Sequence, residues 1–396
     1  MIPYGRQDIT QSDVDAVIDV LRSDFLTQGP AVPRFEDAVA QLAKANHAVA
    51  VNSATSALHI ACIALELGPE DSLWTAPNTF VASANCGRYC GARVDFVDID
   101  PQTWNMSVPA LRDKLAQAEE RGSLPKIVVP VHFGGQPTEQ KEIWDLSRKY
   151  GFRIIEDASH AIGASRNGEL VGSCRWSDIT VFSFHPVKII TCGEGGMALT
   201  NDDELASRMS LLRSHSITRD ASRFQDSEWS TGEATEYGPP TWHYEQQALG
   251  FNYRMTDIQG ALGTSQLERL DDYVERRNAL ASRYDEALKA LPLRLPTIQA
   301  GNRSAFHLYV VRLDTSAAAK SHRQVFDELR QQGIGVNLHY IPVHLQPYYR
   351  ARGFSEGQFP EAEAHGREAI TLPLYPRLSD SMQDRVVTRL KTVLGH

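Results

Sequence analysis

One lysine lies between an apolar, aromatic segment and a cluster of glycines in the stretch FSFHPVKIITCGEGG, residues 182–196. The residues around Lys188 include Phe184, Ile189 and Ile190. Apolar neighbours remove water from an ammonium group, and this favours the neutral, nucleophilic form of the amine. A neutral lysine amine can form a Schiff base with an aldehyde. The stretch therefore predicts a reactive lysine whose partner would be an aldehyde.

A pair of carboxylates ends the apolar part of IIEDASHAIGA, which lies upstream of the lysine. Glu156 and Asp157 stand at the end of a predicted buried strand, where a carboxylate is costly without a partner. A protonated ring nitrogen would be such a partner, and the carboxylate would keep the ring an effective electron sink. A helix cap is the commoner explanation of such a pair. The pair gains weight because a further strand and then Lys188 follow it.

The stretch NSATSAL, residues 52–58, places small and hydroxyl residues between a predicted strand and a predicted helix. Free backbone N–H groups and the helix dipole at such a junction bind phosphate. We expect Ala54 to let a phosphate approach closely and Thr55 to donate its hydroxyl. An ordinary N-cap is the alternative interpretation.

Phe80, in PNTFVASAN, can stack on an aromatic ring, although a phenylalanine of the core is the more common case. With it, the chain contains a phosphate cradle, an aromatic platform, an acid for a ring nitrogen and a lysine for an aldehyde. These four elements in this order match pyridoxal 5′-phosphate.

Composition limits the class of protein. The chain has 396 residues, 42% of them hydrophobic, so we expect one large domain and a smaller one. A formal net charge of -9 argues against a nucleic-acid partner. No apolar run is long enough for a membrane span, and the first residues lack the pattern of a signal peptide. The odd cysteine count without a Cys-x-x-Cys pair predicts reduced thiols in a cytoplasmic protein, with no structural zinc or disulfide framework: Cys62, Cys86, Cys90, Cys174 and Cys192.

The order of elements predicts an α/β fold. Short β-branched runs alternate with helical patterns through the first two-thirds of the chain, which is typical of a mainly parallel sheet covered on both faces. Functional residues of such sheets gather at the carboxyl ends of the strands. Residues 220–247 are polar and acidic, and we expect a long surface loop that is either functional or a solvated excursion. The long amphipathic pattern of SQLERLDDYVERRNALASRYDEALKAL then predicts a linking helix.

Over nearly its whole length the chain resembles the DegT/DnrJ/EryC1/StrS family of sugar-nucleotide aminotransferases, which are fold-type I pyridoxal-phosphate enzymes. The resemblance rests on DFLTQGPAVPRFE, NSATSALH, PNTFVASAN, IIEDASHAIGA, FSFHPVKIITCGEGG, LGFNYRMTDIQGALG and GIGVNLHYIPVH. It implies a large domain with a mainly parallel seven-stranded sheet over residues 1–250. The linking helix and a smaller α+β domain would occupy residues 251–396. It also implies a homodimer with shared active sites.

The resemblance further implies a role for individual residues. Lys188 would be the Schiff-base lysine, and Asp157 would pair with the pyridine nitrogen; these two are the catalytic residues. His160 would contact the 3-oxygen side of the cofactor, and Asn252 would reach the phosphate of the neighbouring subunit's cofactor. The other expected cofactor contacts are Ala54, Thr55, Phe80 and Ser183. The expected substrate contacts are Tyr4, Leu26, Thr27, His339, Tyr340, Ile341, Pro342 and His344.

Two positions depart from the family pattern. Cys192 lies where close relatives tend to have threonine, and Ser216 replaces an expected glycine. Neither change removes a catalytic group.

The implied reaction transfers an amino group from L-glutamate to C4 of a UDP-linked 4-keto-6-deoxy sugar. The sequences of four stretches are most similar to the branch that serves pseudaminic acid biosynthesis: MIPYGRQ, SDFLTQGP, SFHPVKIIT and HYIPVHLQPYY. Another nucleotide-linked sugar, of the perosamine, bacillosamine or 4-amino-arabinose type, remains an alternative, as does a catalytically silent relative. A dehydratase is disfavoured because that branch replaces the lysine with histidine.

Overall fold

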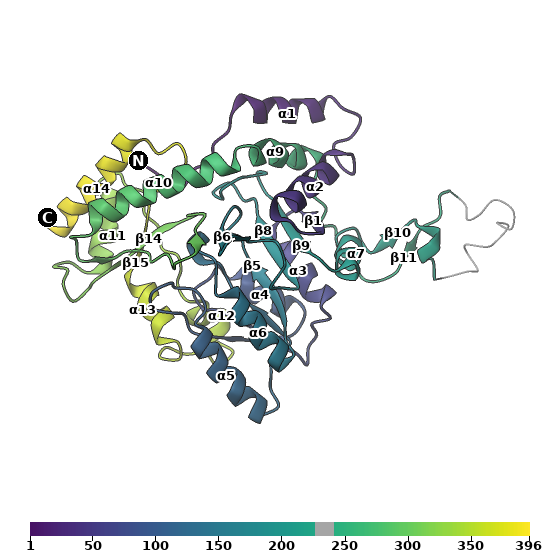
Figure 1. The fold of residues 1–396 in the computed structure, drawn as a ribbon, viewed down its shortest axis with the longest axis horizontal. Coiled ribbons are helices and arrows are strands. Elements are labelled where there is room, and N and C mark those ends of the chain that lie inside the picture. Colours follow the sequence, from purple (N-terminus) through teal and green to yellow (C-terminus); the bar gives the residue numbers. More distant parts are fainter. Residues whose placement is uncertain (226–240) are drawn as a thin grey trace.

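The computed structural model describes residues 1–225 and 241–396, and a seven-stranded sheet lies at its centre (Figure 1). Strand β9 runs antiparallel to both of its neighbours, and the other neighbouring pairs are parallel. This confirms the predicted α/β class and the mainly parallel sheet. In order across the sheet, the strands are β1 (His47–Val51), β9 (Gly196–Thr200), β8 (Ile179–Ser183), β5 (Arg153–Asp157), β4 (Ile127–Val129), β2 (Ser72–Thr75) and β3 (Arg93–Phe96).

Helices cover both faces of this sheet because its central strands are apolar on both sides. Every residue of β8 and β9 is buried. Neighbouring residues of a strand point to opposite faces, so Val181 and Phe182 belong to two different hydrophobic clusters. The described helices of this part of the chain are α1 (Gln11–Leu21), α2 (Ala31–Ala43), α3 (Ala54–Ala64), α4 (Ala82–Tyr89), α5 (Val108–Glu120), α6 (Gln140–Tyr150), α7 (Asp203–Leu212) and α9 (Asp257–Leu267).

A second, antiparallel sheet of β12 (Leu293–Arg294), β14 (Tyr309–Leu313) and β15 (Ala369–Leu372) has its own hydrophobic cluster. In Figure 1 it lies beside the long green α10 (Leu270–Leu288). The remaining helices are α11 (His322–Gln331), α12 (Pro347–Arg350), α13 (Pro360–Glu368) and α14 (Asp380–Leu394). Short 3-10 turns are η1 (Phe133–Gly135), η2 (Ala221–Arg223) and η3 (Val343–Leu345).

The predicted linking helix is divided in two. Its first residues end α9, and α10 begins only at Leu270. Arg269, at the break, binds the buried Asp13 of α1 through its guanidinium, with Nη2 to Oδ2 at 2.7 Å.

The first residues of the chain lie with the second sheet. The Ile2 N–H donates to the carbonyl of Gly333 at 2.8 Å, and Ile2 belongs to the hydrophobic cluster of that sheet. The division into two domains at residue 250 stays a prediction. The first few residues of the predicted large domain are bound to the second sheet, which belongs to the predicted small domain.

The predicted loop 220–247 begins and ends near a short antiparallel pair, β10 (Ile217–Thr218) with β11 (Glu245–Gln246). This pair projects from the body of the molecule in Figure 1. Residues 226–240 of the predicted loop lie outside the described residues. A third small sheet joins β13 (Asn302–Arg303), β6 (Ser165–Arg166) and β7 (Glu169–Leu170). No described helix has an apolar stretch long enough to cross a membrane.

Gly196 brings the start of β9 directly against the N-terminus of α3. A Cβ atom at this position would lie 2.4 Å from backbone atoms of Ser53 and Ala54, so any side chain would force the two segments apart. The close approach holds the first turn of α3 next to the carboxyl end of β8, because Gly196 pairs with Ser183.

Asp257 fixes the start of α2 from a distant part of the sequence. Its buried carboxylate accepts hydrogen bonds from the backbone N–H groups of Gly29 at 2.6 Å, Ala31 at 2.8 Å and Val32 at 3.1 Å. Helix α2 has no capping side chain of its own, since its N-cap residue is Pro30. Asp257 therefore supplies the acceptors that this helix terminus requires.

We expect Asp257→Ala to lower the free energy of unfolding by about 3 kcal/mol, because buried N–H groups lose a charged acceptor. Urea unfolding measures the change. The control is Asp37→Ala, which removes an exposed carboxylate of α2 itself and should change the free energy of unfolding by less than about 0.5 kcal/mol. Equal effects of the two substitutions would show that Asp257 does not cap α2.

Candidate active site

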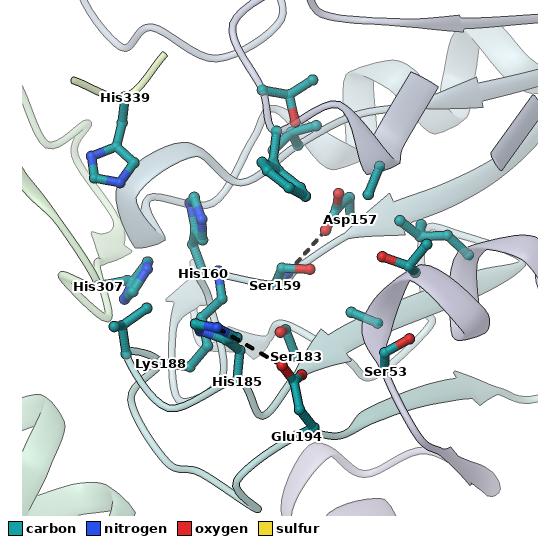
Figure 2. A pocket seen from close by; sticks show the side chains of 18 of the residues that line it. Ser53, Asp157, Ser159, His160, Ser183, His185, Lys188, Glu194, His307 and His339 are labelled. Carbon is teal, nitrogen blue, oxygen red and sulfur yellow. Dashed lines mark hydrogen bonds and ion pairs between the residues drawn. The ribbon is translucent and has the colours of Figure 1, made fainter. Parts of the chain in front are cut away.

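A cavity of about 940 Å³ opens at the carboxyl ends of β5 and β8. Asp157 ends β5 and Ser183 ends β8, so the parallel strands bring the two side chains to the same edge of the sheet. The first turn of α3 forms another wall, and residues 337–340 enclose the cavity from the side of the second sheet. Figure 2 shows Lys188, Asp157 and Ser183 arranged around it, together with the labelled histidines His160, His185, His307 and His339.

Lys188 follows β8 in a turn that backbone hydrogen bonds close. The Cys192 N–H donates to the carbonyl of Phe184 at 3.0 Å, and the Lys188 N–H donates to that of His185 at 2.9 Å. The flanking Phe184, Ile189 and Ile190 are buried in a hydrophobic cluster, while the half-buried Lys188 lines the cavity. Within the described chain its amine has no hydrogen bond or ion pair. Desolvation lowers the pKa of Lys188 to about 8, and this outweighs the opposing charge of Asp157.

Asp157 is held by two hydrogen bonds. Its Oδ2 accepts from the hydroxyl of Ser83 at 2.6 Å, and its Oδ1 accepts from the N–H of Ser159 at 3.1 Å. The Ser83 oxygen lies 2.7 Å from the hydroxyl of Thr79. Because the Ser83 hydroxyl donates its proton to the carboxylate, the Thr79 hydroxyl must donate to the Ser83 oxygen. The chain of three groups orients Asp157 inside the cavity.

Glu156 points to the opposite face of β5, as the two-residue period of a strand requires. Its Oε2 lies 2.8 Å from Nε2 of His132, and Nδ1 of that histidine accepts the N–H of Thr138 at 3.0 Å. His132 therefore donates to Glu156 and both side chains are satisfied. Of the acidic pair in the sequence, only Asp157 lines the large cavity.

The first turn of α3 combines a capped and an uncapped part. The Ser53 hydroxyl accepts the N–H of Ser56 at 3.1 Å, so the alternative interpretation of an N-cap is correct for this residue. Among the described residues the N–H groups of Ala54 and Thr55 have no partner, and both residues line the cavity beside Ser183. Two free N–H groups at a helix N-terminus are suited to bind an anion.

Three histidines form the wall next to Lys188, and all three are neutral. Burial, together with the charge of Lys188, holds the pKa values of His160 and His307 well below the usual range. The same two causes lower the pKa of His339 to about 3. The amine of Lys188 thus faces imidazoles that do not compete with it as cations.

The structure brings many of the predicted site residues together. Those that line the cavity are Tyr4, Ala54, Thr55, Phe80, Asp157, His160, Ser183, Lys188, His339 and Tyr340. Phe80 is 58% exposed, so it is a surface ring of the cavity and not a core residue.

The other predicted residues lie elsewhere. Leu26 and Thr27 are exposed in the turn before α2, and Asn252 is exposed outside this cavity. Ile341 is exposed and Pro342 is buried, and neither lines the cavity. His344 is completely buried, with Nε2 at 3.0 Å from Oε1 of Glu363. The predicted roles of these residues stay predictions.

Several residues of the site were missed by the sequence interpretation. Ser83, which is buried behind the cavity and bonded to Asp157, lies in PNTFVASAN three residues after Phe80, so its position could have been noticed. His307 and Asn337 reach the cavity only through the packing of the second sheet, and no local pattern identifies them.

Two departures from the family pattern also have a structural explanation. Cys192 is buried, and burial raises the pKa of its thiol, so it is an inert side chain. Ser216 has φ of +53°, a conformation that glycine adopts without strain, which accounts for the glycine expected there.

The arrangement can hold a ligand with three matched parts. An aldehyde would meet the free amine of Lys188, a ring nitrogen would meet Asp157, and a phosphate would meet the free N–H groups of Ala54 and Thr55. No cluster of three or more metal-binding side chains occurs among the described residues.

In the cofactor-free protein, we expect Lys188 to be labelled by acetic anhydride with half-maximal rate near pH 8, since its pKa is about 8. A lowered pKa means that the amine is neutral above that value. Mass spectrometry of peptides across a pH series measures the rate, and a short lysine peptide, with a pKa of about 10.4, is the reference. A Lys188 profile identical to that of the peptide would contradict the desolvation.

Comparison with known proteins gives a consistent result over the whole chain. The model of the DegT/DnrJ/EryC1/StrS aminotransferase family matches residues 7–391. The spore coat polysaccharide biosynthesis protein SpsC of Bacillus subtilis is 36% identical over 396 residues, which cover 99% of this chain and 97% of that protein.

Solved structures share the same fold. Spr1654 of Streptococcus pneumoniae, in its PMP form, is 28% identical, with a TM-score of 0.88 and coverage of 100% of this chain and 99% of that chain. PseC of Helicobacter pylori, an aminotransferase involved in the biosynthesis of pseudoaminic acid, is 27% identical, with a TM-score of 0.87 and coverage of 100% and 99%. Enzymes of this family depend on pyridoxal phosphate. The chain therefore belongs to the DegT/DnrJ/EryC1/StrS aminotransferase family, and the protein is a sugar aminotransferase.

Proposed function

We propose that the protein transfers the amino group of L-glutamate to C4 of UDP-2-acetamido-2,6-dideoxy-β-L-arabino-hex-4-ulose. The product is UDP-4-amino-4,6-dideoxy-N-acetyl-β-L-altrosamine, the aminated sugar of pseudaminic acid biosynthesis. The observation that carries the amino transfer is the unpartnered amine of Lys188, with a pKa of about 8, in one cavity with Asp157. The structural similarity to PseC and the resemblance of the sequence HYIPVHLQPYY to the pseudaminic acid branch support the choice of sugar.

Another nucleotide-linked 4-keto-6-deoxy sugar is the second candidate. The 36% identity to SpsC, a spore coat polysaccharide biosynthesis protein, favours keeping it, because that identity exceeds the 27% identity to PseC. Substrates of the perosamine, bacillosamine or 4-amino-arabinose type belong to this candidate.

The residues of the cavity fit pyridoxal 5′-phosphate. Asp157 would face the ring nitrogen and Phe80 would stack on the ring. The phosphate would be held by the N–H groups of Ala54 and Thr55 and by the Ser183 hydroxyl. When bound, the cofactor supplies an aldehyde and an electron-withdrawing ring.

Lys188 has two tasks in this proposal. Its amine, neutral above a pH of about 8, anchors the cofactor covalently. Once released, Nζ would carry protons between the cofactor and the reacting carbons of the donor and the sugar, which is general acid–base catalysis. The neutral His160, His307 and His339 leave Nζ as the basic group of this wall. Asp157, fixed by Ser83 and Ser159, keeps the proton of the ring nitrogen in place.

The assembly that we propose is a cytoplasmic homodimer with shared sites. Asn252 is exposed and outside its own cavity, which suits the expected contact with the cofactor phosphate of the neighbouring subunit. Leu26 and Thr27 are exposed in the same way and are assigned to substrate contacts of the assembled site.

Loss of the Ser83 hydroxyl should lower kcat about tenfold, which corresponds to about 1.4 kcal/mol for one hydrogen bond to a charged group. The reason is that Ser83→Ala removes the 2.6 Å hydrogen bond that orients Asp157. KM for the sugar should stay unchanged. The matched control is Ser147→Ala, which removes an equally buried hydroxyl bonded to the carbonyl of Trp144, remote from the site. A parallel loss in both variants would indicate a general effect on folding.

The substrate is tested with a panel of 4-keto UDP and dTDP sugars, incubated with the enzyme and glutamate and analysed by mass. We expect amination of the UDP-linked L-arabino ketone. Preference for a dTDP sugar or for the D-xylo ketone would overturn the assigned substrate and leave the aminotransferase class unaffected.

The same sugars are also incubated with Lys188→Ala, which should lose all turnover but still bind pyridoxamine phosphate. Lys289→Ala, at the exposed position that follows α10, is the control and should remain fully active. Turnover by Lys188→Ala would refute both tasks assigned to the lysine.

A further inference from the structure

Both ring nitrogens of His160 are already engaged inside the protein. Nδ1 lies 3.3 Å from the backbone nitrogen of Gly134, and Nε2 lies 3.2 Å from the hydroxyl oxygen of Tyr340. A backbone N–H can only donate, so Nδ1 must present its lone pair. In the neutral ring the hydrogen is therefore on Nε2, and it points at Tyr340.

The surroundings of His160 keep the ring neutral. Burial, followed by the charge of Lys188, holds its pKa well below the usual range. His307 packs against it with ring centroids 4.5 Å apart, and this imidazole is neutral for the same reasons. Nε2 thus remains a single-proton donor at physiological pH.

This tautomer determines where the proton of Tyr340 goes. The Tyr340 oxygen accepts the hydrogen bond from Nε2, so its own O–H must point elsewhere. Burial and the charge of Asp157 raise the pKa of Tyr340, so the hydroxyl keeps its proton. Among the described residues the hydroxyl has no other partner, and Tyr340 lines the cavity, where its ring centroid lies 6.4 Å from that of Phe80.

We propose that Tyr340 donates a hydrogen bond to an acceptor oxygen of the bound ligand, and that His160 is the positioning residue that directs this hydroxyl into the cavity. The inference rests on the proposed function. It replaces the expected direct contact of His160 with the 3-oxygen side of the cofactor, because neither nitrogen of His160 is free. The acceptor is either the phenolic oxygen of the cofactor or an oxygen of the sugar.

A double-mutant cycle tests whether His160 acts through Tyr340. Tyr340→Phe removes the hydroxyl and keeps the ring, and His160→Leu removes the donor; each should lower kcat/KM for the sugar about tenfold. The double variant should be as active as the less active of the two single variants, because both substitutions remove the same interaction. His160→Gln offers one acceptor and one donor and should restore most of the activity. A hundredfold loss in the double variant would mean independent roles and would overturn the proposal.

Two measurements separate the sources of the oxygen. If the oxygen belongs to the cofactor, Tyr340→Phe shifts the pH titration of cofactor absorbance in the absence of sugar. If it belongs to the sugar, the titration is unchanged and KM for the sugar rises about tenfold. Absence of both effects would overturn the donor role of Tyr340.

Nitrogen-15 NMR of the cofactor-free protein tests the tautomer independently of the reaction, with His160→Gln identifying the resonance. We expect the Nε2–H form throughout a pH range of about 6 to 8. An Nδ1–H or imidazolium form would overturn the proposal. Failure of the wild type to bind the cofactor at Lys188 would instead refute the proposed function, and the tautomer would still decide the orientation of Tyr340.

Discussion

The desolvation of one amine is the constraint on which the site depends. Lys188 reacts as a neutral amine, and the turn after β8, in which Phe184, Ile189 and Ile190 are buried, favours that form because desolvation lowers the pKa of Lys188 to about 8. The cavity wall beside Lys188 is also uncharged, because burial keeps His160, His307 and His339 neutral. The carboxylate of Asp157 acts in the opposite direction but is tied by its own hydrogen bonds. Fold and chemistry are thus connected through the removal of water.

Local patterns in the sequence predicted the parts of the site that single elements build. The lysine turn, the end of β5 and the first turn of α3 each combine a strand end with residues of a recognisable type, and parallel strands then bring these ends together. The local pattern alone left Glu156 and Asp157 equivalent, and it was the family resemblance that assigned the role to Asp157. Their separation follows from the alternation of side chains along β5, with His132 taking up Glu156.

Contacts between distant segments could not be predicted in this way. The bond from Ser83 to Asp157 and the contact of His160 with Tyr340 join residues far apart in the chain, and no periodicity encodes them. The break between α9 and α10 has the same origin, since Arg269 turns toward Asp13 of α1. Residues such as Leu26, Thr27 and Asn252 lie on the surface of this chain, so contacts within the chain do not reveal their role.

The attachment of the first residues to the second sheet has a practical consequence for handling the protein. Ile2 is buried and hydrogen-bonded to Gly333 and Gly335, and Tyr4, two positions later, is part of the cavity wall. An affinity tag fused ahead of Met1 would therefore be joined three residues before a residue that lines the cavity. The helix that ends the chain, α14, leaves His396 exposed, so a purification handle placed there is attached outside the segment that holds Ile2 and Tyr4.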